Sequence, residues 1–344
     1  MEQIFTQGRR GRVIRPFCDS AEVECRGCSE PLQRALTDLG ADDPLAGAAR
    51  KLKEHYGIEV PVSLIRALTQ KHGETILASQ KQGSELPDQP GVAVLIGEAD
   101  GSMVPVVETA EPAQGEAGID RRKTRQVTWK EARLCLVHAP GSVTPVFGAT
   151  MGTGDQAGER LWECALDAGA GSQTKFHCLG DGASWIAEQV DLRFGAQAKY
   201  LIDFFHLCEY VAAAAPVVAG KGKEPWMEEK KTWLKANRWA DVLKSLQPFL
   251  ESEKIPDKDA PVRACYRYIA NRTHFLDYKG ALAAGLPIGS GEIESAHRYV
   301  IQIRLKIAGA WWKIENTSKM LALRVLRSNG GWEDYWENQG QKAA

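Results

Sequence analysis

The hydrophobic residues of this chain change their spacing twice, and each change predicts a change of secondary structure. Up to about residue 73 they recur every three or four positions, which is typical of helices. From Gly91 to about residue 206 they run continuously or alternate, which predicts strands with two helices between them. Beyond residue 207 the helical spacing returns. This order predicts an α/β fold in which helices flank a mixed sheet.

Three short helices are predicted near the N-terminus. Their start signals are Ser29–Pro31, Asp43–Pro44 and Ser63, and their stop signals are Gly40, Gly57 and Gly73. Three such helices with a short connection over 57–62 are typical of a helix-turn-helix domain, and a generic helical bundle is the alternative. In a helix-turn-helix domain the third helix would contact DNA through Arg66, Gln70 and Lys71, with His72 as a further candidate.

Five strand regions follow a polar linker over residues 74–90. They are predicted at 92–108, 131–139, 143–150, 174–182 and 198–206, with helices at 155–168 and 183–195. In α/β sheets the chemistry gathers at the carboxyl ends of the strands. Asp100 interrupts the first strand, Asp181 follows the fourth, and Asp203 lies at the end of the fifth. Asp181 and Asp203 therefore compete as candidates for one position at the edge of the sheet.

The second half of the chain is predicted to be helical. Residues 207–285 lack a strand pattern, and their Trp- and Leu-containing stretches alternate with charged and Pro-containing breaks, which predicts a helical insertion. A helix of about four turns then begins after Ser290, with Glu292 and Glu294 in its first turn, where the helix dipole favours negative charge. Its apolar face consists of Ile293, Ala296, Val300, Ile303 and Ile307. A further helix is predicted near 314–328.

Composition narrows the class of protein. The 344 residues are 44% hydrophobic and 25% charged, as in a globular protein. The chain has no apolar run long enough to cross a membrane and no apolar signal segment, so a cytoplasmic protein is expected. The net charge of −1 does not indicate a nucleic-acid binder, but basic residues cluster over Arg9–Arg15 and Arg121–Arg125.

The cysteines predict reduced thiols. Eight of them are scattered without a secreted disulfide framework. Cys25 and Cys28 form a C-x-x-C pair, and Cys18 lies nearby. A zinc site would need a fourth ligand, for which His55 is the nearest histidine, so buried or free thiols are the favoured interpretation.

Asp100, Asp181 and Glu294 are the candidate chemistry of the chain. Two strand carboxylates and a helix carboxylate that converge would hold a pair of Mg²⁺ ions, which take few protein carboxylates together with water and phosphate oxygens. Two such ions about 3.5–4 Å apart activate an attacking oxygen and stabilise a leaving one in phosphodiester displacement. The alternative for each aspartate is a turn, because Asp100-Gly101 and Asp181-Gly182 are also turn dipeptides.

Four phrases of the sequence resemble DDE transposases of bacterial insertion sequences. They are GEADGSMVPVVE, GDGASWIAEQV, YLIDFFHLCEY and GLPIGSGEIESAHRYVIQIRLKIAGAWW, the last being the most specific. They are similar to the branch with a long helical insertion before the glutamate, which is related to Mutator-like transposases. The resemblance covers residues 91 to about 330. It implies an RNase H-like core and metal-dependent DNA strand cleavage and strand transfer.

The resemblance also implies a role for individual residues. Asp100 and Asp181 match the two aspartates of the motif, and Glu294 matches the glutamate, with two Mg²⁺ ions as cofactors that Mn²⁺ can replace. The choice of Glu294 over Glu292 depends on this motif, because helix geometry does not decide it. The expected supporting residues, which orient ligands or contact phosphate, are Asp203, His206, His297 and Arg298.

The resemblance implies a domain order and a set of partners. The domains are 1–80 (helical and DNA-binding), 91–206 (first part of the core), 207–285 (helical insertion) and 286–344 (glutamate helix and C-terminal helices). The partners are the terminal inverted repeats of an element, target DNA and further copies of the chain assembled on DNA. Two alternatives stay open: a DNA-binding regulator derived from an inactive transposase, and a structure-selective nuclease on the same core.

Overall fold

The computed structural model describes residues 5–6, 13–14, 28–109 and 125–343. The structure does not describe Cys18 and Cys25, the arginines at positions 9, 10, 12 and 15, or residues 121–124, and Cys28 is buried. The preference for buried or free thiols over a zinc site therefore stays a prediction. Within the described ranges, no helix is long and apolar enough to cross a membrane.

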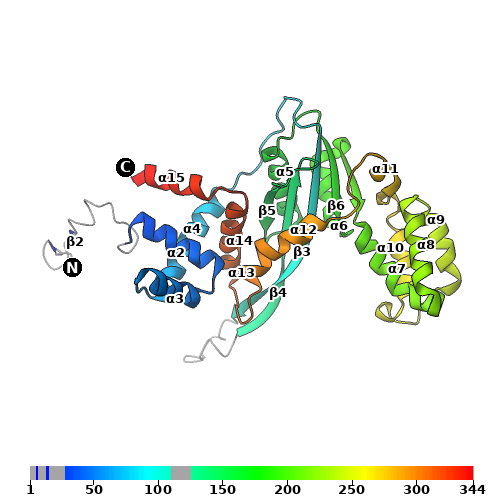
Figure 1. The fold of residues 1–344 in the computed structure, drawn as a ribbon, viewed down its shortest axis with the longest axis horizontal. Coiled ribbons are helices and arrows are strands. Elements are labelled where there is room, and N and C mark those ends of the chain that lie inside the picture. Colours follow the sequence, from blue (N-terminus) through cyan, green and yellow to red (C-terminus); the bar gives the residue numbers. More distant parts are fainter. Residues whose placement is uncertain (1–4, 7–12, 15–27, 110–124, 344) are drawn as a thin grey trace, which may run out of the picture.

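A five-stranded mixed sheet forms the centre of the fold (Figure 1). Its strands are β3 (Val94–Thr109), β4 (Arg125–His138), β5 (Val146–Thr150), β6 (Lys175–Gly180) and β7 (Ala198–Ile202). The strand order is β5-β4-β3-β6-β7, in which β3, β4 and β5 are antiparallel and β6 and β7 run parallel to β3. This confirms the predicted mixed α/β fold. A separate two-stranded sheet pairs β1 (Phe5–Thr6) with β2 (Val13–Ile14).

The two faces of the sheet are covered by different helices. Along β3, Leu95 and Ala99 pack with α5 (Gly154–Asp167) and α6 (Ser184–Phe194). On the other face, Val104 and neighbouring β4 residues pack with α12 (Gly291–Ala296) and α14 (Ile314–Ser328). Because side chains alternate along a strand, the even-numbered positions of β3, including Asp100, belong to the α12 face.

The three predicted N-terminal helices are present as α2 (Glu30–Asp42), α3 (Leu45–Tyr56) and α4 (Val62–Ala78). Gly57 ends α3 with a φ of 67°, as expected. Gly73, however, does not end α4, which continues for five more residues. A Cβ at Gly73 would lie 2.7 Å from the Lys319 carbonyl oxygen, so glycine allows α4 to pack closely on α14. The helix-turn-helix function of these helices stays a prediction.

His72 is not available on the surface of α4, contrary to the sequence prediction. Its Nδ1 lies 2.8 Å from the Tyr335 hydroxyl of α15 (Trp332–Ala343), and its Nε2 lies 3.2 Å from Gln33 Oε1. Burial lowers the pKa of His72 to about 4, with a contribution from Lys71. His72 therefore joins the N-terminal helices to the C-terminal helix as a neutral imidazole.

Residues 204–283 form a helical segment at the opposite end of the sheet from the N-terminal helices (Figure 1). Its helices are α7 (Phe204–Ala219), α8 (Lys223–Lys235), α9 (Trp239–Leu246), α10 (Pro261–Ala270) and α11 (Tyr278–Ala283). The strand predicted to reach residue 206 ends at Ile202, because Asp203 accepts a hydrogen bond from the His206 N–H (2.8 Å) and so caps α7.

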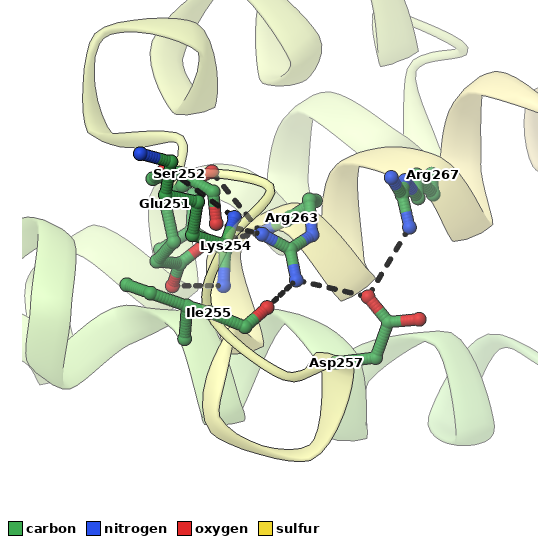
Figure 2. A network of polar contacts seen from close by, with 8 residues as sticks. Glu251, Ser252, Lys254, Ile255, Asp257, Arg263 and Arg267 are labelled. Carbon is green, nitrogen blue, oxygen red and sulfur yellow. Dashed lines mark hydrogen bonds and ion pairs between the residues drawn. The ribbon is translucent and has the colours of Figure 1, made fainter.

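The connection before α10 is fixed by a buried arginine (Figure 2). Arg263 donates hydrogen bonds to the carbonyl groups of Ser252 and Ile255 (both 2.5 Å), and it pairs with Asp257 at 2.9 Å. Glu251 accepts the backbone N–H groups of Val262 (2.9 Å) and Arg263 (2.7 Å) at the start of α10. These contacts hold α10 in one orientation relative to the rest of the segment.

The long helix predicted after Ser290 is divided into three parts. They are α12, a π-helical segment (His297–Gln302) and α13 (Ile303–Leu305). A π-helical turn holds one residue more than an α-turn, so the positions that face the core after it are shifted along the sequence relative to a regular α-helix. As a result Val300, Ile301 and Leu305 are buried, whereas Ile303, which was expected on the apolar face, is 53% exposed.

Gly73→Ala should lower the free energy of unfolding by roughly 1–3 kcal/mol, because the added methyl group would meet the Lys319 backbone of α14. Gly47→Ala is the matched control within α3, where the nearest atom to an added Cβ is 3.8 Å away. It should raise stability by up to about 1 kcal/mol, through helix propensity alone. Urea unfolding of the two variants measures both effects, and equal changes would contradict the packing role of Gly73.

Candidate active site

Asp100 and Asp181 lie on adjacent parallel strands. The pairing of β3 with β6 aligns Glu98 with Leu179, and the same register continued by two residues aligns Asp100 with Asp181. Neighbouring strands are about 4.8 Å apart. Asp181 follows the last residue of β6, as the sequence predicted, and Asp100 lies inside the long β3 strand. The two aspartates thus belong to neighbouring strands of the sheet, one inside β3 and the other directly after the end of β6.

The helix that carries Glu294 is attached to the sheet by two buried carboxylates. Glu98 Oε2 accepts the Ile293 N–H of α12 at 2.8 Å. Asp203 Oδ2 accepts both the backbone N–H and the hydroxyl of Ser290 at 2.5 Å. Carboxylates at a helix N-terminus satisfy free N–H groups and are favoured by the helix dipole. Ser290, predicted as a helix cap, thus donates its hydroxyl to Asp203.

The chain leading into α12 is fixed along the edge formed by β6 and β7. The Ile288 carbonyl group accepts the Phe204 N–H at 2.8 Å, and the Pro287 carbonyl oxygen lies 2.8 Å from His177 Nε2. The Gly289 backbone lies so close to the Phe205 ring that a Cβ there would be 2.6 Å away. The helix start is therefore held over four consecutive residues.

His297 contacts the first aspartate. Its Nε2 lies 3.0 Å from Asp100 Oδ2, and its side chain is buried. Burial lowers the pKa of Lys306, and the Asp100 carboxylate partly offsets this effect. A cation therefore lies near this carboxylate. Glu294 lies three residues before His297, hence on the same side of the helix, and is exposed. Arg298 is exposed as well.

Glu292 has a different neighbour from Glu294. Its Oε2 lies 3.2 Å from Nε2 of the buried His138, at the end of β4. The His138 Nδ1 lies 2.9 Å from the Ala139 carbonyl oxygen, which assigns the proton to that nitrogen. The two first-turn glutamates of α12 are therefore distinguished by their surroundings.

The helical segment 204–283 fixes the turn that carries Asp181. The Tyr268 hydroxyl of α10 donates to the Asp181 carbonyl oxygen at 2.6 Å, and Arg272 donates to the Gly182 carbonyl oxygen at 3.3 Å. The Asp181 carboxylate accepts the Ala183 N–H at 2.8 Å. Gly182 has a φ of 87°, and an added Cβ would lie 2.6 Å from the Tyr268 hydroxyl, so only glycine suits this turn.

Asp203 and His206 lie behind the turn. Asp203 is buried and connects the start of α7 to Ser290. The His206 ring packs edge-on against Tyr268 and Tyr210, at centroid distances of 5.9 and 5.6 Å. Both residues thus contact groups that position the candidate ligands.

Carboxylate oxygens are the ligands that Mg²⁺ prefers. Among the described residues, no group of three or more His, Cys, Asp and Glu side chains lies close enough to hold a metal ion. Mg²⁺ usually takes one or two protein carboxylates and completes its octahedron with water and phosphate oxygens. Asp100 and Asp181 are carboxylates of the kind such a site uses, whereas Asp100, Asp181 and Glu294 do not gather into a three-ligand group in this structure.

The profile of the Uncharacterised protein family (UPF0236) matches residues 162–341, which include Asp181, Asp203 and the whole of α12. The chain belongs to this family. No curated protein matches it. Among solved structures it is similar to the Drosophila P element transposase strand transfer complex, with 10% identity and a TM-score of 0.31 over 93% of this chain and 83% of that chain.

Glu98 is the residue of this UPF0236 chain that the sequence analysis missed. It is 2% exposed, and burial raises its pKa to about 8, with Glu292 and Asp203 adding to the effect and the Ile293 N–H opposing it. The signal was present in the sequence, because Glu98 lies two residues before Asp100 in an otherwise apolar strand and hence on the same face.

Glu98→Gln should remove a pH dependence of stability in the metal-free UPF0236 protein. In the folded chain Glu98 keeps its proton up to about pH 8, whereas the unfolded chain loses it near pH 4.5. Between these two pH values folding is therefore coupled to the uptake of one proton by Glu98. The free energy of unfolding falls as pH rises through this range, by up to about 1.4 kcal/mol per pH unit. The variant amide still accepts the Ile293 N–H. Equal slopes for both proteins in urea unfolding between pH 5 and 8 would contradict this.

Proposed function

We propose that this protein is a DDE transposase, which cleaves DNA at the ends of its element and transfers the strands to a target. The observation that carries the proposal is the pairing of β3, which contains Asp100, with β6, which Asp181 directly follows, together with the attachment of the α12 helix to β3. The strand order β5-β4-β3-β6-β7 supports the RNase H-like core that the sequence resemblance implies.

In this proposal Asp100, Asp181 and Glu294 hold two Mg²⁺ ions, which Mn²⁺ can replace. Bound ions would supply charge stabilisation for phosphodiester displacement. The protein's own groups orient the ligands: His297 contacts Asp100, and Tyr268 holds the Asp181 backbone. Lys306 and the exposed Arg298 are cations available to phosphate oxygens.

The DNA partners of the proposal are the terminal inverted repeats and the target. Residues 29–73 would bind the repeats, and the chain would assemble into a homo-oligomer on DNA. The exposed Arg66 and Lys71 and the half-buried Gln70 of α4 support this role, because side chains that contact base edges have to be accessible.

Asp100→Asn, Asp181→Asn and Glu294→Gln should each abolish Mg²⁺-dependent nicking of element-end DNA, while folding and end binding survive. Loss of a metal ligand removes several kcal/mol of charge stabilisation, which is roughly a thousandfold or more in rate. Gel assays with end-labelled DNA measure nicking.

Glu292→Gln is the matched control for the helix carboxylate, because Glu292 lies in the same turn of α12 but beside His138. It should retain nicking. Loss of nicking in this variant, with nicking retained in Glu294→Gln, would transfer the ligand role to Glu292. Wild-type nicking of unrelated duplexes at the same rate would instead favour a structure-selective nuclease.

Asp203→Asn should leave measurable nicking, whereas Asp181→Asn leaves none. Asp203 acts through Ser290 and the start of α7, so its loss disturbs the position of α12 without removing a ligand. Residues that only orient metal ligands typically contribute 10–100-fold. A titration of nicking rate with Mg²⁺ compares the two variants. The reverse order would identify Asp203 as the ligand.

A further inference from the structure

A groove of about 740 Å³ lies between the N-terminal helices and the core. One wall comes from α3 and α4, and the other comes from the distal part of the β3–β4 hairpin and the connection between α13 and α14 (Figure 1). The groove therefore exists only because the N-terminal helices pack against the core.

The groove is basic and contains two tryptophans. Its cations are Arg66, Arg125, Arg304 and Lys313, and none of the described side chains that line it is acidic. Trp311 is 60% exposed, whereas Trp312 is half-buried. A concentration of positive charge next to an accessible aromatic ring is the usual combination for binding a single strand of nucleic acid.

One side of the groove is rigid. The Arg304 guanidinium lies 4.7 Å from the centre of the Trp312 ring and donates through Nε to the Gly40 carbonyl oxygen at 3.1 Å. The Trp312 carbonyl oxygen accepts the Val107 N–H of β3 at 2.7 Å. These contacts hold the 307–313 connection in place, so that Trp311 projects from a fixed backbone.

The groove leads toward the candidate active site. Val107 lines the groove, and Asp100 lies earlier on the same strand, β3. His297, which lies 3.0 Å from Asp100, belongs to the helical run that ends at the connection lining the groove. A strand bound along residues 307–313 would therefore continue toward Asp100. The groove has the size of a small-molecule site, which suits a few nucleotides of one strand rather than a duplex.

We propose that this groove binds an unpaired stretch of DNA, with phosphates on Arg66, Arg125 and Lys313 and a base stacked on Trp311. The inference rests on the proposed function for the identity of the ligand as DNA. It adds that the DNA site is composite: Arg66 and Gln70 of α4 line the groove together with core residues, whereas Lys71 does not line it.

The test measures binding of the full-length protein to fluorescent DNA in EDTA, by anisotropy, so that cleavage plays no part. Two probes are compared: a blunt duplex and the same duplex with a short single-stranded extension. Trp311→Ala should weaken binding of the extended probe roughly 5- to 150-fold, the range for loss of one base stack, and leave the blunt probe unaffected. Trp311→Phe should retain most of the preference for the extension.

Trp129→Ala is the matched aromatic control, because Trp129 is 58% exposed on β4 and does not line the groove. For charge, Arg66→Ala should lower the salt dependence of extended-probe binding by about 0.7 per phosphate contact. Arg50→Ala, an exposed cation of α3 outside the groove, should leave it unchanged.

Equal binding of the extended probe by wild type, Trp311→Ala and Arg66→Ala would overturn the inference. An equal loss by Trp311→Ala on both probes would also overturn it, since that result indicates no preference of Trp311 for the unpaired stretch. The proposed function fails separately. If wild type does not nick element-end DNA with Mg²⁺ while the groove variants lose the preference, the groove stands and the transposase proposal falls.

Discussion

The arrangement of the candidate active site depends on the attachment of one helix to the sheet. Glu98 in the middle of β3 and Asp203 after β7 accept N–H groups from Ile293 and Ser290, at the N-terminal end of α12. Free N–H groups at a helix start have to be satisfied when they are buried, and the side-chain oxygens of Glu98 and Asp203 satisfy them here. With both anchors in place, α12 has one orientation over β3, and that orientation sets the positions of Glu294 and His297.

A second constraint comes from the helical segment 204–283, which contributes no candidate ligand. Tyr268 of α10 holds the Asp181 carbonyl group, and Arg263 holds α10 against the preceding connection. The ring of Tyr268 stacks on Tyr210 of α7 at a centroid distance of 4.1 Å. Since α7 begins at Asp203, the same segment touches both the Asp181 turn and the anchor of α12. The helical segment thus contacts residues that precede it in the sequence and is joined to residues that follow it.

The elements with strong periodicity were predictable from the sequence, and those shaped by tertiary contacts were not. The helix 314–328 and the five strands follow apolar spacing, which reports local burial. Gly73 was predicted to end a helix, because the sequence does not distinguish a glycine that terminates a helix from one that lets two helices pack closely. The π-helical turn after Ala296 shifted the buried face from Ile303 to Leu305, and residue types alone do not encode that shift. Asp100 and Asp181 were found from strand position and resemblance, whereas Glu98 was overlooked as a residue of a buried strand.

Burial explains why two carboxylates on one strand face take different roles. Glu98 is 2% exposed and its pKa is raised to about 8, so near neutral pH it is mostly protonated and serves as a hydrogen-bond partner of α12. The Asp100 side chain is 27% exposed and has His297 beside it, so it is accessible to a ligand from solvent. Two residues along β3 separate Glu98, which holds the helix, from the partly exposed Asp100. A charged Glu98 would place a poorly solvated negative charge beneath the helix, and protonation of Glu98 avoids that cost.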